Sequence, residues 1–224
     1  MVRSENKPAI GILGGTFDPV HFGHLRTGLD VVEQLSLDQL RLIPCAIPPH
    51  RIEPVANAKQ RRMMLELAIK NHPKLLVDDR ELSREGPSYT VDTLLSLRED
   101  FPDTPLFLLM GTDAFCSLPS WSRWQQIIEL AHIVVMQRAD ETFLLSDELQ
   151  SFFEQHQAEK ADIELSAGKI WSVPVTQMSI SATAIREALE QGRDVRYLLP
   201  DAVISLIEQL GLYPQISSVS ETDG

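Results

Sequence analysis

The sequence predicts a single α/β domain built on a mainly parallel β-sheet with helices on both faces. Three observations lead to this prediction. Short apolar segments alternate with amphipathic segments of helical length, as in a parallel sheet with crossover helices. The first unit reads strand, glycine turn, helix. The chain has 224 residues, of which 43% are hydrophobic, so it can bury one core. We place the domain at residues 1–214 and expect 215–224 to be a disordered tail.

The first half of the chain contains two strand-helix units and the start of a third. The apolar run at 9–15 predicts a buried strand, and apolar residues recur at helical spacing over 22–35. A second strand is expected over 40–49, where two prolines must end it. A helix is expected from about 57 to 71.

The middle of the chain continues this alternation. We expect a third strand over 74–79 and a helix over 90–100, which closes before a proline. The run 105–113 predicts a fourth strand, 123–131 a helix and 132–138 a fifth strand.

The last third is more irregular before the pattern returns. Residues 139–168 are polar and predict a partly helical excursion, and 169–175 a sixth strand. Two helices are expected over 181–192 and 201–211. In such a sheet, ligands bind outside the carboxyl ends of the strands.

The formal net charge of −12 disfavours a nucleic-acid polymer as partner, because such binding normally needs a broad basic surface. A small anion bound in a local positive pocket remains compatible with this charge. No apolar run approaches the roughly 20 residues that cross a bilayer, and the N-terminus lacks a signal-peptide pattern, so we expect no membrane partner and a cytoplasmic protein. Cys45 and Cys116 have no zinc spacing and are expected to be reduced structural thiols.

One candidate site follows the first strand. Gly14 and Gly15 stand where a phosphate could approach bare backbone, although a tight turn alone would also require glycine. His21 and His24 are three residues apart at a helix start, which puts both rings on one face beside the positive helix end. This arrangement favours anion binding. Metal binding with Asp18 and a purely structural role remain alternatives.

A second candidate site lies near the C-terminus. Ser181 is a good N-cap, Thr183 adds a hydroxyl to the first turn, and Arg186 lies within reach of the same helix end. These residues predict a second phosphate cradle, and the alternative is an ordinary capped helix with a surface arginine.

Together, "GGTFDPVHFGH" and the downstream "ISATAIR" resemble the paired (H/T)xGH and SxTxxR motifs of the nucleotidyltransferase superfamily. The segments "IPPHR", "GPSYTVDTL" and "GTDAF…LPSWSRW" are similar to the bacterial nicotinate-nucleotide adenylyltransferases. The resemblance spans about residues 8–214. It implies a Rossmann-like, doubly wound fold, with ATP and nicotinate mononucleotide as substrates and Mg²⁺ carried by the ATP phosphates.

The resemblance also implies residue roles on the ATP side. His21, His24 and Arg186 would be catalytic, with His24 nearest the α-phosphate and Arg186 on the departing pyrophosphate. It assigns ATP binding to Gly14, Gly15, Thr16, Phe17, Gly111, Asp113, Ser181 and Thr183.

For the mononucleotide, the resemblance implies backbone amides at Tyr89 and Thr90 for the nicotinate carboxylate and a stacking face at Trp121. It also assigns Asp18, His50 and Arg51 to this side. Two departures from the family pattern concern the same region: many relatives have Lys where this chain has Arg51, and some have Asn around Cys45 and Ala46. Trp124, Trp171 and Tyr197 have no motif support and are expected to be structural.

Three other functions compete with this interpretation. Phosphopantetheine adenylyltransferases share both phosphate motifs, but "PPHR" and "LPSWSRW" fit them poorly. A non-catalytic nucleotide sensor would not need both His24 and Arg186. A metal hydrolase would use the histidines and Asp18. The sequence leaves the oligomeric state open, a homo-oligomer included.

Overall fold

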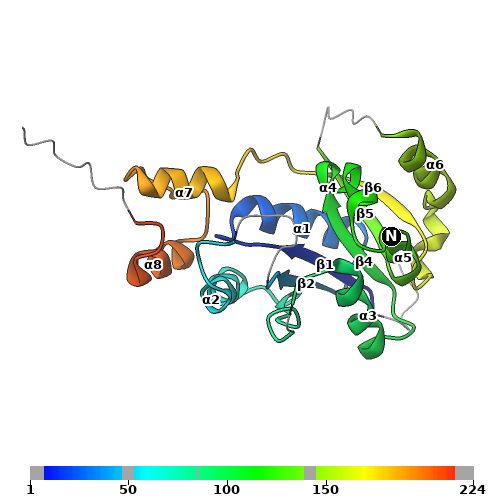
Figure 1. Ribbon diagram of the computed structural model, residues 1–224, viewed down its shortest axis with the longest axis horizontal. Helices are drawn as coiled ribbons and strands as arrows, with labels where there is room; N and C mark the ends of the chain where they lie inside the picture. Colours follow the sequence, from blue (N-terminus) through cyan, green and yellow to red (C-terminus); the bar gives the residue numbers. More distant parts are fainter. Residues whose placement is uncertain (1–7, 47–52, 85, 139–144, 215–224) are drawn as a thin grey trace, which may run out of the picture.

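The computed structural model describes residues 8–46, 53–84, 86–138 and 145–214. Six parallel strands form one sheet in the order β3-β2-β1-β4-β5-β6 (Figure 1). The strands are β1 (Ile10–Gly15), β2 (Gln39–Pro44), β3 (Leu75–Val77), β4 (Leu106–Gly111), β5 (His132–Arg138) and β6 (Ile170–Val175). The helices are α1 (Phe22–Gln34), α2 (Ala58–Ile69), α3 (Thr90–Asp100), α4 (Thr112–Cys116), α5 (Trp124–Leu130), α6 (Asp147–His156), α7 (Ala182–Glu190) and α8 (Asp201–Leu210), with 3₁₀ turns η1 (Leu118–Ser120) and η2 (Lys160–Glu164).

Two apolar layers cover the sheet, one on each face. Successive strand residues alternate between them. Ile12 of β1 belongs to the layer that includes residues of α3, α4, α5 and α6, and Leu13 belongs to the layer that includes residues of α1, α2, α7 and α8. This is the predicted doubly wound α/β fold, and the order of the six strands is that of a Rossmann sheet.

The strand order creates a crevice at one end of the sheet. The helix α1 after β1 covers one face of the sheet, and the helices α4 and α5 after β4 cover the other, so the chain leaves these neighbouring strands toward opposite faces. The arrowhead of β1 points toward the end of the molecule where α7 and α8 lie (Figure 1). A long segment after β6 carries the chain back to this end.

Most expected elements are present, but the ends of the second, third and fourth strands were predicted wrongly. The second strand was expected over 40–49, whereas β2 ends at Pro44. We expected the fourth strand to continue to Asp113, whereas β4 ends at Gly111 and Thr112 opens the short helix α4. Gly111 has extended backbone and is the residue before that helix. The third strand is also shorter than expected, over Leu75–Val77. The partly helical character predicted for 139–168 is confirmed for its described part by α6 and η2.

Three aromatic residues and two cysteines were expected to be structural. Trp171 is buried in β6, and Trp124 packs edge to face against Phe152. Tyr197 instead is 87% exposed, so it has no packing role in the core. Neither cysteine forms a disulfide within the described part of the chain, but the side chain of Cys116 is exposed and does not contribute to the core.

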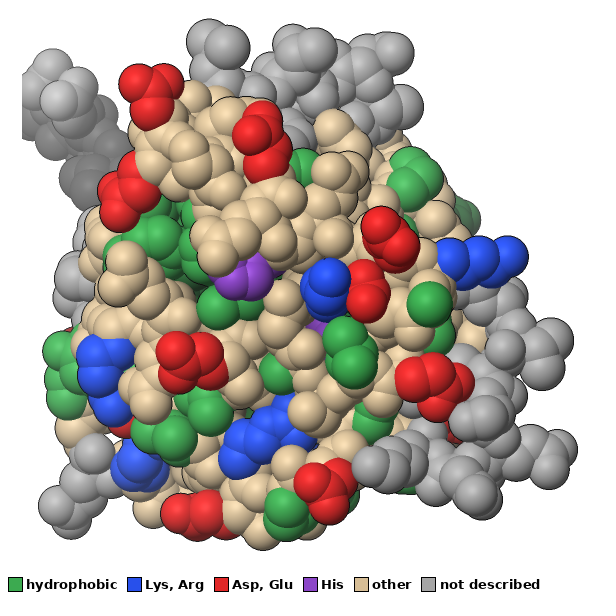
Figure 2. All heavy atoms as spheres, turned by 90° about the vertical axis from the view of Figure 1, so that its right-hand side faces the viewer, with side chains coloured by type: hydrophobic (Ala, Val, Ile, Leu, Met, Phe, Trp, Pro, Cys, Tyr) green, Lys and Arg blue, Asp and Glu red, His purple; other side chains and the backbone are tan. Residues whose placement is uncertain are grey.

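The molecular surface is mixed in charge. On the face shown in Figure 2, carboxylates are spread among uncharged and apolar side chains, and the visible Lys and Arg side chains do not form one continuous basic surface. None of the helices formed by the described residues is long and apolar enough to cross a membrane.

A buried arginine that sequence reasoning missed joins the loops at the carboxyl end of the sheet. Arg61 of α2 is 1% exposed, and its guanidinium donates hydrogen bonds to the carbonyls of Thr16, Cys45 and Ala56 at 2.7–3.1 Å. Thr16 follows β1, Cys45 follows β2, and Ala56 precedes α2. One cation therefore satisfies carbonyls in three loops that would otherwise lack donors in the core.

We expect Arg61→Met to lower the free energy of unfolding by about 3 kcal/mol, because it leaves buried carbonyls without donors. Chemical denaturation measures this change. The matched control is Arg62→Met, one residue further along α2, whose side chain is exposed and forms surface ion pairs with Glu66 and Asp79. Equal losses in the two variants would contradict the role assigned to Arg61.

Candidate active site

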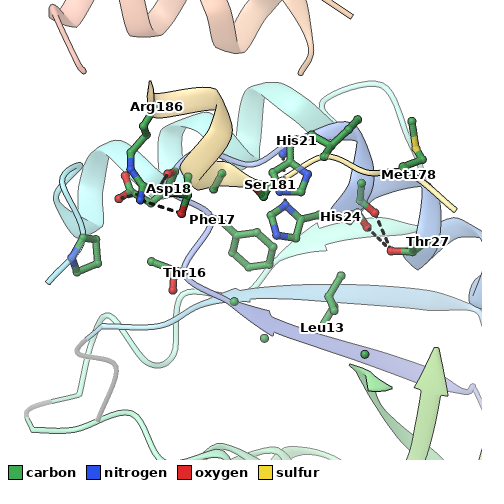
Figure 3. Close-up of a pocket in the computed structure, with 18 of the residues that line it drawn as sticks. Leu13, Thr16, Phe17, Asp18, His21, His24, Thr27, Met178, Ser181 and Arg186 are labelled. Carbon is green, nitrogen blue, oxygen red and sulfur yellow. Dashed lines mark hydrogen bonds and ion pairs between the residues drawn. The ribbon is translucent and has the colours of Figure 1, made fainter. Parts of the chain in front are cut away.

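A pocket of about 890 Å³ opens at the carboxyl ends of β1 and β4, where the strand order predicts it (Figure 3). Eleven of the residues assigned to the site from the sequence line this pocket. They are Gly14, Gly15, Thr16, Phe17, Asp18, His21, His24, Gly111, Ser181, Thr183 and Arg186. The two motifs, more than 150 residues apart in sequence, therefore share one cavity.

The two adjacent glycines serve different purposes. A Cβ on Gly15 would come within 3.0–3.2 Å of the Phe17 ring, so this glycine lets the buried ring pack beneath the turn. A Cβ on Gly14 would meet no atom within 4 Å and would stand in the open pocket. The packing explanation therefore applies to Gly15, while the space beside Gly14 is compatible with the predicted approach of a phosphate to bare backbone.

His21 and His24 lie together at the start of α1. Their rings stack with centroids 3.7 Å apart, and Phe17 packs against His24 edge to face. His24 Nδ1 accepts a hydrogen bond from the His21 backbone N–H at 3.3 Å, which leaves the proton of the neutral ring on Nε2. The buried His21 Nδ1 has no hydrogen-bond partner among the described residues, although the ring lines the pocket.

Both histidines are neutral at physiological pH. Burial lowers the pKa of His21 to about 4. Burial, together with the neighbouring His21, lowers the pKa of His24 to about 3. Anion binding by this pair, as expected from the sequence, would therefore depend on ring N–H donors and the positive end of α1 rather than on imidazolium charge.

The helix α7 brings the second motif to the same cavity. Ser181 is its N-cap, as predicted, and its hydroxyl accepts a hydrogen bond from the Ala184 N–H at 3.1 Å. The guanidinium of Arg186 donates to the Asp18 carbonyl at 2.7 Å and to the Thr183 hydroxyl at 3.3 Å. Arg186 places a permanent positive charge beside the first turn of this helix, and both features favour an anion there.

Asp18 is buried, and its carboxylate is already occupied. It accepts hydrogen bonds from the N–H groups of Val55 and Ala56 and from the hydroxyl of Tyr213, at 2.6–3.0 Å. A carboxylate with three donors has little capacity left for a metal ion or a substrate group. This geometry favours a positioning role over the mononucleotide contact expected from the resemblance.

Four residues expected at the site do not line this pocket. Asp113 lies in the first turn of α4, just beyond Gly111, and its side chain is exposed. Tyr89 is the residue before α3, Thr90 is the first residue of that helix, and Trp121 is partly buried against the apolar layer that contains α3 and α5. His50 and Arg51 lie outside the described residues.

The segment that precedes α3 is held by its neighbours. The Ser88 hydroxyl accepts a hydrogen bond from the Ala46 N–H at 2.9 Å, and the Thr93 hydroxyl donates to the Glu81 carboxylate at 2.6 Å. Burial raises the pKa of Glu81. The Ala46 N–H therefore already has a hydrogen-bond partner within the protein. At this position, where some relatives have Asn, the backbone amide is not a free donor for a substrate.

Sequence reasoning missed part of the pocket wall. Glu53, Pro54 and Val55 line one side, and Met136 with several residues of the segment that follows β6 lines another. The end of β6 contributes Val175, and the segment after it contributes Thr176, Met178 and Ile180. Its only sequence signal was its position before the SxTxxR motif.

Comparison with known proteins gives a consistent result. Residues 12–188 match the family model described as cytidylyltransferase-like. A protein of Methylococcus capsulatus named "Probable nicotinate-nucleotide adenylyltransferase" is 49% identical over 91% of this chain and 99% of its own length. One of the same name from Aeromonas hydrophila is 46% identical over 92% of this chain and 98% of its own length.

Solved structures share the fold. The Plasmodium falciparum nicotinic acid mononucleotide adenylyltransferase complexed with NaAD aligns with a TM-score of 0.71 at 20% identity, over 92% of this chain and 97% of that one. A putative nicotinate-nucleotide adenylyltransferase from Vibrio parahaemolyticus aligns with a TM-score of 0.63 at 18% identity, over 92% and 95%. With both motifs on one pocket and relatives near half identity over almost the whole length, the chain belongs to the nicotinate-nucleotide adenylyltransferase family, within the cytidylyltransferase-like proteins.

Proposed function

We propose that this protein transfers the adenylyl group of ATP to nicotinate mononucleotide, which gives deamido-NAD and pyrophosphate. A 5′-phosphate oxygen of the mononucleotide forms a bond to the α-phosphorus of ATP. The bond from that phosphorus to the oxygen that bridges to the β-phosphorus breaks, and pyrophosphate leaves with that oxygen. The attacking phosphate is already ionised, so the step needs no general base and no covalent enzyme intermediate.

One observation carries this proposal: two separate sets of anion-binding groups face the same cavity. His21, His24 and the start of α1 form one set, and Ser181, Thr183 and Arg186 at the start of α7 form the other. A triphosphate that spans the cavity would have its α-phosphate at one set and its leaving pyrophosphate at the other. Groups placed in this way stabilise the charge that develops as the bond breaks.

The acceptor is proposed from the names of the relatives and from one solved neighbour. Curated relatives near half identity carry the name nicotinate-nucleotide adenylyltransferase, and a structural neighbour is described as complexed with NaAD. The roles of Tyr89, Thr90 and Trp121 in acceptor recognition stay a prediction, as does that of His50 and Arg51. A cytoplasmic location also remains a prediction.

We propose that Mg²⁺ arrives bound to the ATP phosphates. The described residues contain no group of three His, Cys, Asp or Glu side chains arranged to hold a metal ion. Asp18, an acidic residue of the pocket wall, has both oxygens engaged by protein donors. A cation carried by phosphate oxygens fits this donor set, and it would supply partial neutralisation of the triphosphate.

Incubation with ATP, Mg²⁺ and a panel of acceptors tests the proposal, with pyrophosphate release as the measurement. Nicotinate mononucleotide should be adenylated most efficiently, ahead of its amide and of phosphopantetheine. Turnover with phosphopantetheine alone would support the related adenylyltransferase instead. ATP binding without turnover of any acceptor would support a nucleotide sensor. Tightly bound stoichiometric zinc in the purified protein would support a hydrolase.

We expect His24→Ala to reduce turnover by about 10²-fold or more, because the variant lacks an N–H donor at the reacting phosphate. Steady-state kinetics measures this. The control is His72→Ala, which removes a histidine from the turn between α2 and β3, away from the pocket. Near-normal turnover of the His24 variant would refute its assigned role.

Two glycines of β1 offer a matched pair. Gly14→Ala should raise the KM for ATP and leave the melting temperature almost unchanged, because its Cβ enters open pocket. Gly11→Ala should lower the unfolding free energy by about 1–3 kcal/mol, because its Cβ would lie 2.8 Å from Leu40 and 2.9 Å from Leu37. Kinetics and thermal denaturation measure both effects. A Gly14 variant that loses stability but binds ATP normally would contradict this division.

The low pKa values of the two histidines predict a pH-dependent stability. Between about pH 6.5 and 4, the unfolded chain binds protons that folded His21 and His24 do not, so the free energy of unfolding should fall as the pH is lowered. Each histidine contributes at most about 1.4 kcal/mol per pH unit.

Denaturant unfolding at pH 5 and pH 7.5 measures this dependence in the wild type and in His24→Asn. The variant should lose less stability than the wild type over this interval, because it lacks one of the depressed groups. Other titrating groups, including Glu81 with its raised pKa, cancel in the comparison. An identical pH dependence in both proteins would show that His24 is not neutralised by the fold.

A further inference from the structure

Tyr213 connects the C-terminal end of the described chain to the active site. Its hydroxyl donates a 2.6 Å hydrogen bond to Oδ1 of Asp18, 195 residues away in sequence. The side chain is buried, and the residue follows α8 in the left-handed backbone region with φ of 54°. Burial, together with the bond to Asp18, raises the pKa of the Tyr213 hydroxyl, which therefore stays a neutral donor throughout the physiological range.

The bond affects a second neighbour of Asp18, which is Arg186. The Arg186 guanidinium donates to the backbone carbonyl of Asp18 at 2.7 Å, while the Asp18 carboxylate oxygen Oδ2 is 3.9 Å from the same nitrogen, beyond hydrogen-bond distance. A buried carboxylate and a nearby guanidinium attract strongly at this separation. The carboxylate is held back by its three donors, Tyr213 and the N–H groups of Val55 and Ala56 (Figure 3 shows Asp18 and Arg186).

We propose that Tyr213 is a positioning residue: by satisfying the Asp18 carboxylate, it keeps Arg186 from pairing fully with that carboxylate and leaves the guanidinium available to the leaving pyrophosphate. This inference deepens the proposed function and rests on its placement of pyrophosphate at Arg186. Tyr213 touches neither substrate nor reacting atoms in this account. Its effect passes through Asp18 to Arg186.

The inference explains two features that the reaction chemistry alone leaves open. Asp18 lines an anion-binding pocket, where a free carboxylate would repel phosphate, and the Tyr213 hydroxyl offsets part of this repulsion by donating to it. Tyr213 also has a backbone conformation that non-glycine residues seldom adopt, and its side chain is buried.

The test is the affinity for pyrophosphate in the presence of Mg²⁺, measured by calorimetry without acceptor. Tyr213→Phe keeps the ring and two of the three donors to Asp18, so we expect it to fold. It should weaken pyrophosphate binding about tenfold, because the Asp18 carboxylate would then compete with pyrophosphate for the Arg186 guanidinium. The matched control is Tyr197→Phe, which removes the same hydroxyl from an exposed tyrosine that also has positive φ and should bind pyrophosphate like the wild type.

Repeating Tyr213→Phe in an Arg186→Gln background distinguishes positioning of Arg186 from a purely structural role of Tyr213. If Tyr213 acts through Arg186, Tyr213→Phe should have little further effect on pyrophosphate affinity in this background, because the guanidinium that it positions is absent. Unchanged affinity of the single variant, or an equally large loss in the Arg186→Gln background, would overturn the inference. All proteins are compared at a temperature well below the lowest melting midpoint.

The kinetic consequence is specific to the triphosphate side. Tyr213→Phe should lower kcat/KM for ATP by a similar factor and leave the KM for the mononucleotide almost unchanged. If the wild type binds pyrophosphate but adenylates no acceptor, the proposed function fails while the binding comparison still decides the role of Tyr213. A defect confined to the mononucleotide KM would overturn the inference and leave the proposed function intact.

Discussion

A carboxylate in a protein interior is tolerated only when donors replace the water that it loses, and this requirement organises the carboxyl end of the sheet. Asp18 recruits the amides that precede α2 and the hydroxyl that follows α8, while its carbonyl receives Arg186 of α7. Three segments that are distant in sequence are thereby brought to the turn after β1. Arg61 of α2 adds to this arrangement by donating hydrogen bonds to carbonyls in the loops after β1, after β2 and before α2.

In the proposed function, the pocket binds anions with few fixed charges, although the protein as a whole is acidic. Its histidines are neutral, and its cation is Arg186 among the described lining residues. The remaining attraction comes from ring N–H groups and from the starts of α1 and α7. Neutral donors in fixed positions suit a reaction in which charge moves along a triphosphate, because they need no reorganisation and do not hold the product pyrophosphate as tightly as several cations would.

The sequence alone predicted the features of the fold and the candidate site that depend on local sequence patterns. Strand and helix order follows from periodicity, the Ser181 cap from residue type, and the meeting of the two motifs from the rule that ligands bind where parallel strands end. The end of β4 at Gly111 was missed because the polar residues Thr112 and Asp113, which follow the apolar run, did not distinguish the end of a strand from the first turn of a helix. Arg61 and Tyr213 were missed for a different reason. Their roles depend on partners 45 and 195 residues away in sequence, and a buried Arg or Tyr has no periodic signal.

The central claim is that both motifs act on a single triphosphate, whose α-phosphorus is attacked while pyrophosphate leaves. Isotopic labelling of ATP tests this most directly. With nicotinate mononucleotide as acceptor, label on the α-phosphorus should appear in the dinucleotide, and label on the γ-phosphorus should appear in pyrophosphate with none in orthophosphate. Release of γ-label as orthophosphate, or of α-label as AMP, would mean that the pocket hydrolyses ATP or cleaves it at another bond, and would contradict the account.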